Sequence, residues 1–133
     1  MNLENIFCSK LSDSNFKEIS PIVLAFIGDA VHTLYIRDKV VAKVNLNVNK
    51  CHLQSSKKCN AKAQSIFLDK IYNSLNDIEK DIIKRARNSK THHIAKNSDV
   101  ETYKKATSFE ALIGYLFLKK DFERLNQILL NEE

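Results

Sequence analysis

Two carboxylates stand out because each lies in an almost wholly apolar stretch and close to a glycine. Asp29 directly follows Gly28, and Glu110 lies four residues before Gly114. These are the only two glycines of the chain. Glycine inside a helix costs about 1 kcal/mol relative to alanine, so we expect both glycines to mark a close approach between two helices. Such a crossing would bring Asp29 and Glu110 together.

Two carboxylates in apolar surroundings repel each other, and one of them takes up a proton unless a cation lies between them. Mg²⁺ suits such a pair, because it prefers oxygen ligands and is commonly held by one or two carboxylates with substrate phosphate. A metal ion in that place would support phosphoryl chemistry. A structural role is the alternative: Asp29 would bond a helix N-terminus or His32, and Glu110 would pair with a lysine. The histidines do not have the HExxH spacing of a zinc site.

Helices must position these acids. Ser20 and Pro21 are typical of an N-cap and a first-turn proline, so we expect a helix to begin there. The apolar run that follows covers nearly every side of this helix, which indicates burial and makes Asp29 a costly buried charge. Apolar periodicity predicts an all-α fold with helices at residues 21–43, 50–74 (broken or kinked near 59–60), 77–88, 100–118 and 122–130.

The composition bounds the class of protein. A chain of 133 residues, 44% of them hydrophobic, is expected to form a single domain over residues 1–133. Two glycines and one proline are too few for an all-β fold. Residues 1–10 lack the features of a signal peptide, and no apolar run has the roughly 18 residues of a membrane span. We therefore predict a cytoplasmic protein with no membrane partner, whose three cysteines are free thiols.

The positive charge is concentrated in one segment. Residues 85–105 hold six basic and two acidic residues, whereas the rest of the chain holds 15 basic and 14 acidic ones. Basic side chains neutralise phosphates, and amides add hydrogen bonds. We therefore predict an RNA-binding surface. The alternative is a charged face that only contacts solvent. Its candidate residues are Arg85, Arg87, Asn88, Lys90, Lys96, Asn97 and Lys104, with Lys62 from an earlier segment.

Several of these motifs together resemble the ribonuclease III family. Segments 24–30 (Leu-Ala-Phe-Ile-Gly-Asp-Ala) and 109–114 (Phe-Glu-Ala-Leu-Ile-Gly) are similar to its catalytic domain. The other segments resemble its short members, the Mini-ribonuclease III group, and the resemblance covers nearly the whole chain. Those segments are 60–64 (Asn-Ala-Lys-Ala-Gln), 85–90 (Arg-Ala-Arg-Asn-Ser-Lys), 96–103 (Lys-Asn-Ser-Asp-Val-Glu-Thr-Tyr) and 107–112 (Thr-Ser-Phe-Glu-Ala-Leu).

The resemblance implies an all-helical ribonuclease III fold, a homodimer and Mg²⁺-dependent cleavage of double-stranded RNA, with Mn²⁺ as a substitute ion. It implies that Asp29 and Glu110 are the catalytic residues and the metal ligands. The implied substrate is precursor large-subunit (23S) ribosomal RNA, cut by a catalytic domain without a separate double-stranded-RNA-binding domain. Two acids of full-length ribonuclease III are replaced by Ala25 and Thr107, so the second metal site is in doubt.

Two other functions fit the same residues. An inactive ribonuclease III-like domain would bind structured RNA in ribosome assembly without cutting it. The retention of both Asp29 and Glu110 argues against that function. A helical protein-interaction module would show no salt-dependent affinity for RNA.

Overall fold

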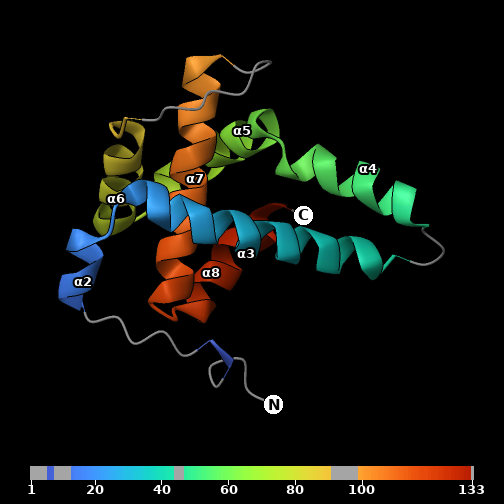
Figure 1. The fold of residues 1–133 in the computed structure, drawn as a ribbon, viewed down its shortest axis with the longest axis horizontal. Coiled ribbons are helices and arrows are strands. Elements are labelled where there is room, and N and C mark those ends of the chain that lie inside the picture. The colour runs from blue at the N-terminus through green and yellow to red at the C-terminus, as the bar shows by residue number, and fades with distance from the viewer. Residues whose placement is uncertain (1–5, 8–12, 44–46, 91–98, 133) are drawn as a thin grey trace.

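The computed structural model describes residues 6–7, 13–43, 47–90 and 99–132. In this part of the chain every regular element is a helix, as predicted (Figure 1). The elements are α2 (Asp13–Glu18), α3 (Pro21–Val41), α4 (Val48–Cys59), α5 (Ala61–Ile71), the 3₁₀ turn η1 (Tyr72–Ser74), α6 (Asp77–Arg87), α7 (Val100–Leu118), α8 (Phe122–Leu129) and the 3₁₀ turn η2 (Leu130–Glu132). None of these helices is both long and apolar enough to cross a membrane.

Capping side chains explain where the helices begin. The Ser20 hydroxyl accepts from the Ile22 N–H, and Pro21 occupies the first turn of α3, which confirms the predicted start. The predicted break after Cys59 is also confirmed: the Asn60 side chain donates to the Ser56 carbonyl at 2.7 Å and accepts from the Ala63 N–H at 2.8 Å. One asparagine therefore ends α4 and begins α5, because its side chain carries both a donor and an acceptor.

Several boundaries differ from the prediction by one to three residues, and two of them differ by two residues. α3 ends at Val41, not at residue 43, and α4 begins at Val48, not at residue 50. The earlier start of α4 has a physical cause, because the Asn47 side chain accepts from the Lys50 N–H at 2.9 Å and caps the helix. The predicted ends of α7 agree with the structure, where Asp99 caps the helix by accepting from the Thr102 N–H at 2.6 Å.

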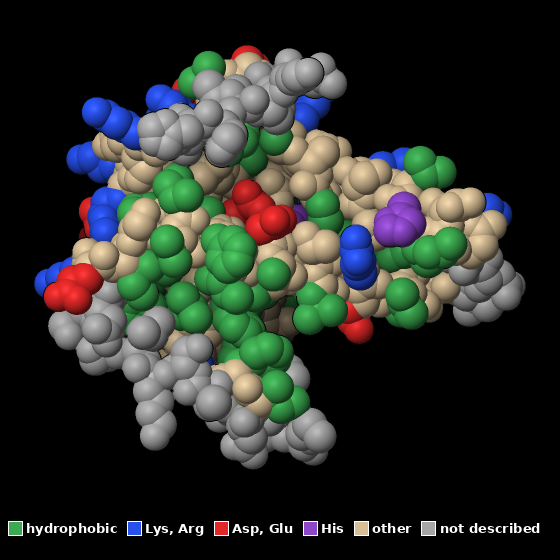
Figure 2. Space-filling model, viewed as in Figure 1, with side chains coloured by type: hydrophobic (Ala, Val, Ile, Leu, Met, Phe, Trp, Pro, Cys, Tyr) green, Lys and Arg blue, Asp and Glu red, His purple; other side chains and the backbone are tan. Residues whose placement is uncertain are grey.

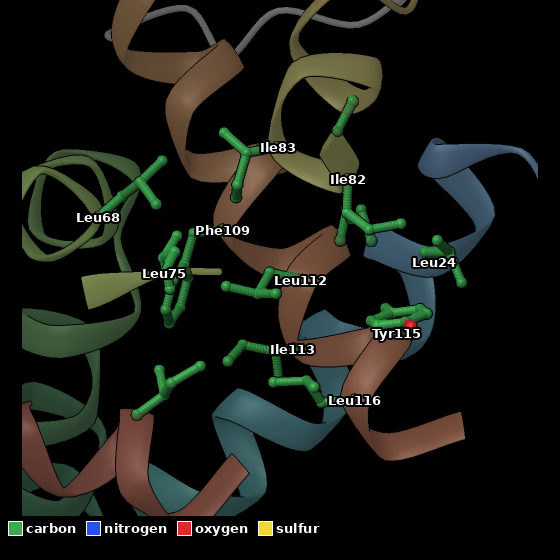
Figure 3. Packing of buried hydrophobic residues seen from close by; sticks show 14 of the residues in the cluster. Leu24, Leu68, Leu75, Ile82, Ile83, Phe109, Leu112, Ile113, Tyr115 and Leu116 are labelled. Atoms are coloured by element: carbon green, nitrogen blue, oxygen red, sulfur yellow. The ribbon is translucent and has the colours of Figure 1, made fainter. Parts of the chain in front are cut away.

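The central element is α7, which α3, α5, α6 and α8 surround (Figures 1 and 3). Phe109, Leu112 and Ile113 are completely buried, and side chains of the neighbouring helices converge on them in Figure 3. A helix that is apolar on nearly every side is stable only inside such a core. The apolar run at 109–118 therefore forms the centre of the molecule.

The crossing of α3 and α7 depends on the two glycines. A Cβ atom added to Gly28 would collide with the backbone carbonyl of Glu110, and one added to Gly114 would collide with the backbone carbonyl of Leu24. The two backbones thus touch with no room for any side chain. The predicted close approach at Gly28 and Gly114 is confirmed.

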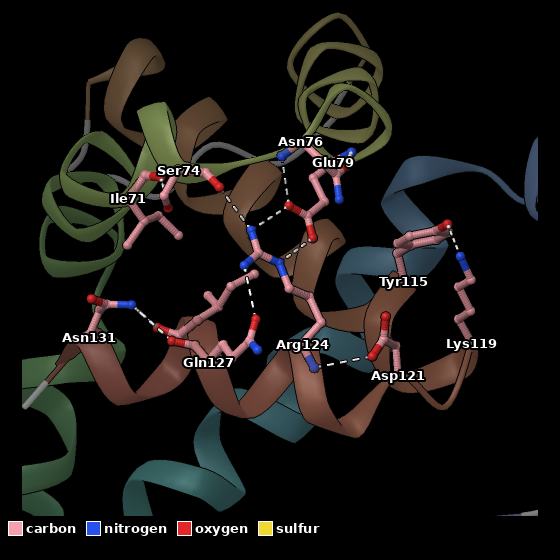
Figure 4. A network of polar contacts seen from close by, with 11 residues as sticks. Ile71, Ser74, Asn76, Glu79, Tyr115, Lys119, Asp121, Arg124, Gln127 and Asn131 are labelled. Atoms are coloured by element: carbon pink, nitrogen blue, oxygen red, sulfur yellow. Dashed lines mark hydrogen bonds and ion pairs between the residues drawn. The ribbon is translucent and has the colours of Figure 1, made fainter.

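A buried ion pair joins α6 to α8 and was not predicted. The carboxylate of Glu79 is 2% exposed and receives two hydrogen bonds of 2.8 Å from the Arg124 guanidinium (Figure 4). Arg124 also donates to the Ser74 carbonyl, and Glu79 accepts from the Asn76 N–H in a capping box. Burial by itself would raise the pKa of Glu79, but these hydrogen bonds and the positive charge of Arg124 outweigh it and lower the pKa.

We predict that Arg124→Ala lowers the free energy of unfolding by about 3 kcal/mol, because it leaves the Glu79 carboxylate buried without its partner. Chemical denaturation measures this loss. The destabilisation should shrink as the pH falls below the ordinary carboxyl pKa of 4.5, since protonated Glu79 no longer needs the cation. Lys105→Ala is the matched control, because its pair with Asp69 is exposed and such pairs contribute less than about 1 kcal/mol. Equal losses in the two variants would contradict the prediction.

Candidate functional site

The glycine crossing brings together the two carboxylates that the sequence singles out. Asp29 lies on α3 next to Gly28, and Glu110 lies on α7 one turn before Gly114. Their side chains are hydrogen-bonded to each other. Figure 2 shows acidic side chains gathered on the surface near the α3–α7 crossing of Figure 1. The predicted juxtaposition of Asp29 and Glu110 is therefore present in the structure.

The burial of the pair differs from the expectation. Asp29 is exposed, so the prediction that it is a buried charge was wrong, and Glu110 is the more buried acid. The reason is that α3 turns Leu24, Ala25 and Gly28 towards the core, while Asp29 lies at the rim of the contact. The cost of removing a charge from water falls on Glu110.

Three neighbours set the pKa of Glu110. Burial raises it most, and the hydrogen bond and the negative charge of Asp29 raise it further, whereas a hydrogen bond from Gln64 lowers it. The result is a pKa of about 8. In the metal-free protein at neutral pH, Glu110 is therefore mostly protonated and shares its proton with Asp29. The structural alternative of a lysine partner for Glu110 is not what the structure shows.

This donor set fits a divalent cation of the Mg²⁺ type. Two acidic side chains meet, and the more buried one ionises only at high pH unless a positive charge is added. Among the described residues, no group of three or more His, Cys, Asp or Glu side chains could hold a metal. Mg²⁺ needs only one or two carboxylates when water and phosphate complete its shell. Ala25 and Thr107, where further acids were expected from the resemblance, are both 7% exposed and add no charge.

The basic candidates fall into two groups by their contacts. Arg85 donates to the Lys17 carbonyl at 3.3 Å and ties α6 to α2, and Arg87 forms an ion pair with Glu101 on α7. These two arginines therefore also contact neighbouring helices. Of the remaining candidates that the structure describes, Asn88, Lys90 and Lys62 are exposed, and Lys104 is half-buried. Lys96 and Asn97 lie outside the described residues.

Two polar residues lie beside the acids: sequence reasoning gave Gln64 no role and named His32 only as a possible partner of Asp29. Gln64 on α5 is 4% exposed, and His32 on α3 is 1% exposed. The Gln64 side chain contacts both His32 and Glu110. Position 64 lies within the segment 60–64 that carried the family resemblance, which was the one available signal. The apolar periodicity of this helix could not predict that Gln64 is buried, because a polar residue interrupts the pattern that indicates burial.

Comparison with known proteins gives one consistent result. A sequence profile described as "Ribonuclease III domain" matches residues 22–121. The chain is 49% identical over 119 residues to "Mini-ribonuclease 3" of Thermoanaerobacter sp. (strain X514), which covers 90% of this chain and 84% of that protein. It is 43% identical over 119 residues to "Mini-ribonuclease 3" of Staphylococcus aureus, at 88% and 89% coverage. A crystal structure of a Fusobacterium nucleatum protein superposes with a TM-score of 0.78 at 37% identity, covering 83% of this chain and 89% of that one.

The raised pKa of Glu110 predicts a pH dependence of stability. A carboxyl whose pKa is higher in the folded protein stabilises the fold fully below its ordinary pKa of 4.5, and this stability is lost as the pH rises through about 8. Each unit of pKa shift corresponds to about 1.4 kcal/mol. In the metal-free protein the free energy of unfolding of Glu110→Gln, relative to wild type, should therefore rise by a few kcal/mol across this interval.

Denaturant titrations in EDTA at a series of pH values measure this difference. Asp69→Asn is the control, because Asp69 is an exposed carboxylate in the same protein. Its stability should run parallel to that of wild type. Parallel curves for Glu110→Gln as well would contradict the prediction.

Proposed function

The chain belongs to the ribonuclease III family, and from this premise we propose that it matures precursor large-subunit (23S) ribosomal RNA as a Mg²⁺-dependent cytoplasmic homodimer. It is an endoribonuclease of the type that acts on double-stranded RNA. The observation that carries the proposal is the acid pair at the glycine crossing. The proposal also treats residues 1–133 as one catalytic domain.

Asp29 and Glu110 would hold the cation, with Mn²⁺ as a substitute for Mg²⁺. When bound, a divalent cation supplies a water molecule of lowered pKa and stabilises the negative charge that develops on the phosphate. Glu110 would give up the proton that burial and its contact with Asp29 hold at neutral pH, and would then accept the cation as a carboxylate. The rigid backbone contact of Gly28 with α7 keeps the two carboxylates at one separation, which is the positioning that catalysis requires.

Basic and amide side chains beyond the acid pair would bind the duplex. The last turn of α6 and the first turns of α7 lie at the same end of the molecule in Figure 1. An A-form duplex is recognised by its shape and phosphates, which suits such a charged surface, where Tyr103 is the one Phe, Tyr or Trp among residues 85–105. The proposed contacts are Arg85, Arg87, Asn88, Lys90, Lys96, Asn97, Lys104 and Lys62.

The exposed face of α3 supports the proposed homodimer. Val23, Phe26, Leu34 and Val41 are 55%, 79%, 65% and 71% exposed. Figure 2 shows hydrophobic side chains spread beside the acidic ones on one face of the molecule. Monomeric proteins rarely leave a large contiguous apolar patch in water. Pairing of two copies through α3 would cover this face and place two acid pairs along one RNA duplex.

We predict that Asp29→Asn slows cleavage of a labelled RNA duplex about a thousandfold, because a cation held by one carboxylate loses several kcal/mol of its stabilising effect. Affinity for the duplex, measured by gel shift in EDTA, should change little. Asp69→Asn serves as the control and should cleave like wild type. The wild-type protein should cut only when Mg²⁺ or Mn²⁺ is present.

The same gels separate the alternatives. Binding without cleavage at any metal concentration would point to an inactive RNA-binding domain. No salt-dependent binding at all would point to a protein-interaction module. Wild-type turnover in Asp29→Asn would overturn the assignment of Asp29 as a metal ligand.

We also predict that Phe26→Glu converts the dimer to a monomer, because it places a charge in the apolar centre of the proposed interface. Light scattering after size-exclusion chromatography measures the mass. Ile78→Glu is the matched control, since Ile78 is 59% exposed on α6, away from α3. Wild type that already runs as a monomer, or a Phe26→Glu variant that stays dimeric, would contradict this interface.

A further inference from the structure

We propose that Gln64 and His32 are positioning residues, which together orient the Glu110 carboxylate as a metal ligand. This inference rests on the proposed function, because it concerns the same site. It is carried by a polar connection that runs through three helices: His32 on α3, Gln64 on α5 and Glu110 on α7.

Two of the three residues in this connection, His32 and Gln64, are buried from solvent. The Gln64 amide nitrogen lies 3.1 Å from Nδ1 of His32. The same side chain is hydrogen-bonded to the Glu110 carboxyl. His32 and Gln64 are 1% and 4% exposed, so bulk water has little access to either side chain. Each polar group buried in this way must find its partner inside the protein.

The donors and acceptors around the Gln64 side chain determine how its amide is oriented. A carboxylate that binds a metal is ionised and can only accept hydrogen bonds, and a neutral imidazole accepts at Nδ1 when its proton is on Nε2. The Gln64 NH₂ group has two hydrogens, one for each of these acceptors. The amide oxygen must then point away from Glu110.

His32 is what makes this orientation unique. The oxygen and nitrogen of a glutamine amide have nearly the same shape, so the group can turn over unless a neighbour distinguishes the two. A turned amide would present its oxygen to the Glu110 carboxylate and repel it. In the tautomer of His32 that carries its proton on Nε2, Nδ1 accepts from the Gln64 NH₂ group, which then faces both His32 and Glu110.

Packing holds His32 in turn. Its ring meets the ring of Phe109 edge to face, with centroids 4.9 Å apart, and Phe109 is completely buried and directly precedes Glu110. Phe67 on α5 packs against the same phenylalanine. The hydrophobic core thereby fixes the His32 imidazole, which orients the Gln64 amide, and the amide in turn orients the Glu110 carboxylate.

The hydrogen bond from Gln64 favours the form of Glu110 that can bind a cation. Asp29 and Glu110 repel each other when both are ionised, whereas the hydrogen bond from Gln64 favours the ionised form of Glu110. Outer residues that orient a metal ligand typically change metal affinity or activity about 10- to 100-fold when they are removed. We therefore expect the amide to raise the affinity of the site for its cation.

The test measures Mn²⁺ binding to the RNA-free protein by electron paramagnetic resonance, which does not depend on turnover. Gln64→Met keeps the length of the side chain but removes the donor, and should weaken Mn²⁺ binding at least about tenfold. His32→Phe keeps the ring against Phe109 but removes the acceptor, and should weaken binding in the same direction. His32→Asn loses the ring but places an oxygen acceptor near Nδ1, and should retain most of the affinity.

Controls and outcomes separate this inference from the proposed function. Gln54→Met and His52→Phe make the same chemical changes on α4, outside the site, and should bind Mn²⁺ like wild type. Thermal unfolding of each variant verifies the fold, and if Gln64→Met does not fold, the comparison of His32→Phe with His32→Asn decides. Wild-type affinity in folded Gln64→Met or His32→Phe, with loss of binding in Glu110→Gln, would overturn the inference and leave the proposed function intact. Wild-type affinity in Glu110→Gln would overturn both.

Discussion

The contact between the backbones of α3 and α7 is the constraint on which the rest of the structure depends. Gly28 and Gly114 remove the side chains that would hold the two helices apart. Because the helices touch, the residues beside the glycines are forced together as well, whatever their charge. Asp29 and Glu110 therefore meet at a place where one carboxyl must hold a proton or share a cation. In the metal-free protein, protonation of Glu110 relieves the repulsion between the two carboxyl groups.

Contacts elsewhere in the fold keep α3 and α7 together although their two carboxyl groups lie close to each other. Phe109, Leu112 and Ile113 on α7 are completely buried in the core and prevent this helix from moving away from α3. On the far side of the core, the Glu79–Arg124 pair joins α6 to α8. Functional sites commonly hold an arrangement that is locally unfavourable and that the surrounding structure maintains. In this chain the apolar core does that for the acid pair.

Charged residues serve two purposes in this small domain. Arg85 and Arg87 were identified as phosphate ligands, yet one binds the backbone of α2 and the other pairs with Glu101. Glu79 lies in the first turn of α6, where an acid suits the helix dipole, yet it is among the most buried of the described side chains. Sequence spacing places a charge on a helix, but the partner comes from a segment far away in the chain. Its burial and its contacts are therefore set by tertiary packing.

The sequence by itself determined the helices, their caps, the family and the crossing at the two glycines. Those features depend on local chemistry, such as the amide of Asn60 or the missing side chains of Gly28 and Gly114. Tertiary packing sets which acid is more buried, because the rotation of α3 about its axis leaves Asp29 exposed at the rim, while Glu110 on α7 is half-buried. It also decided that Gln64 and His32 join the site, since three helices that are distant in sequence must pack before one amide can reach both partners.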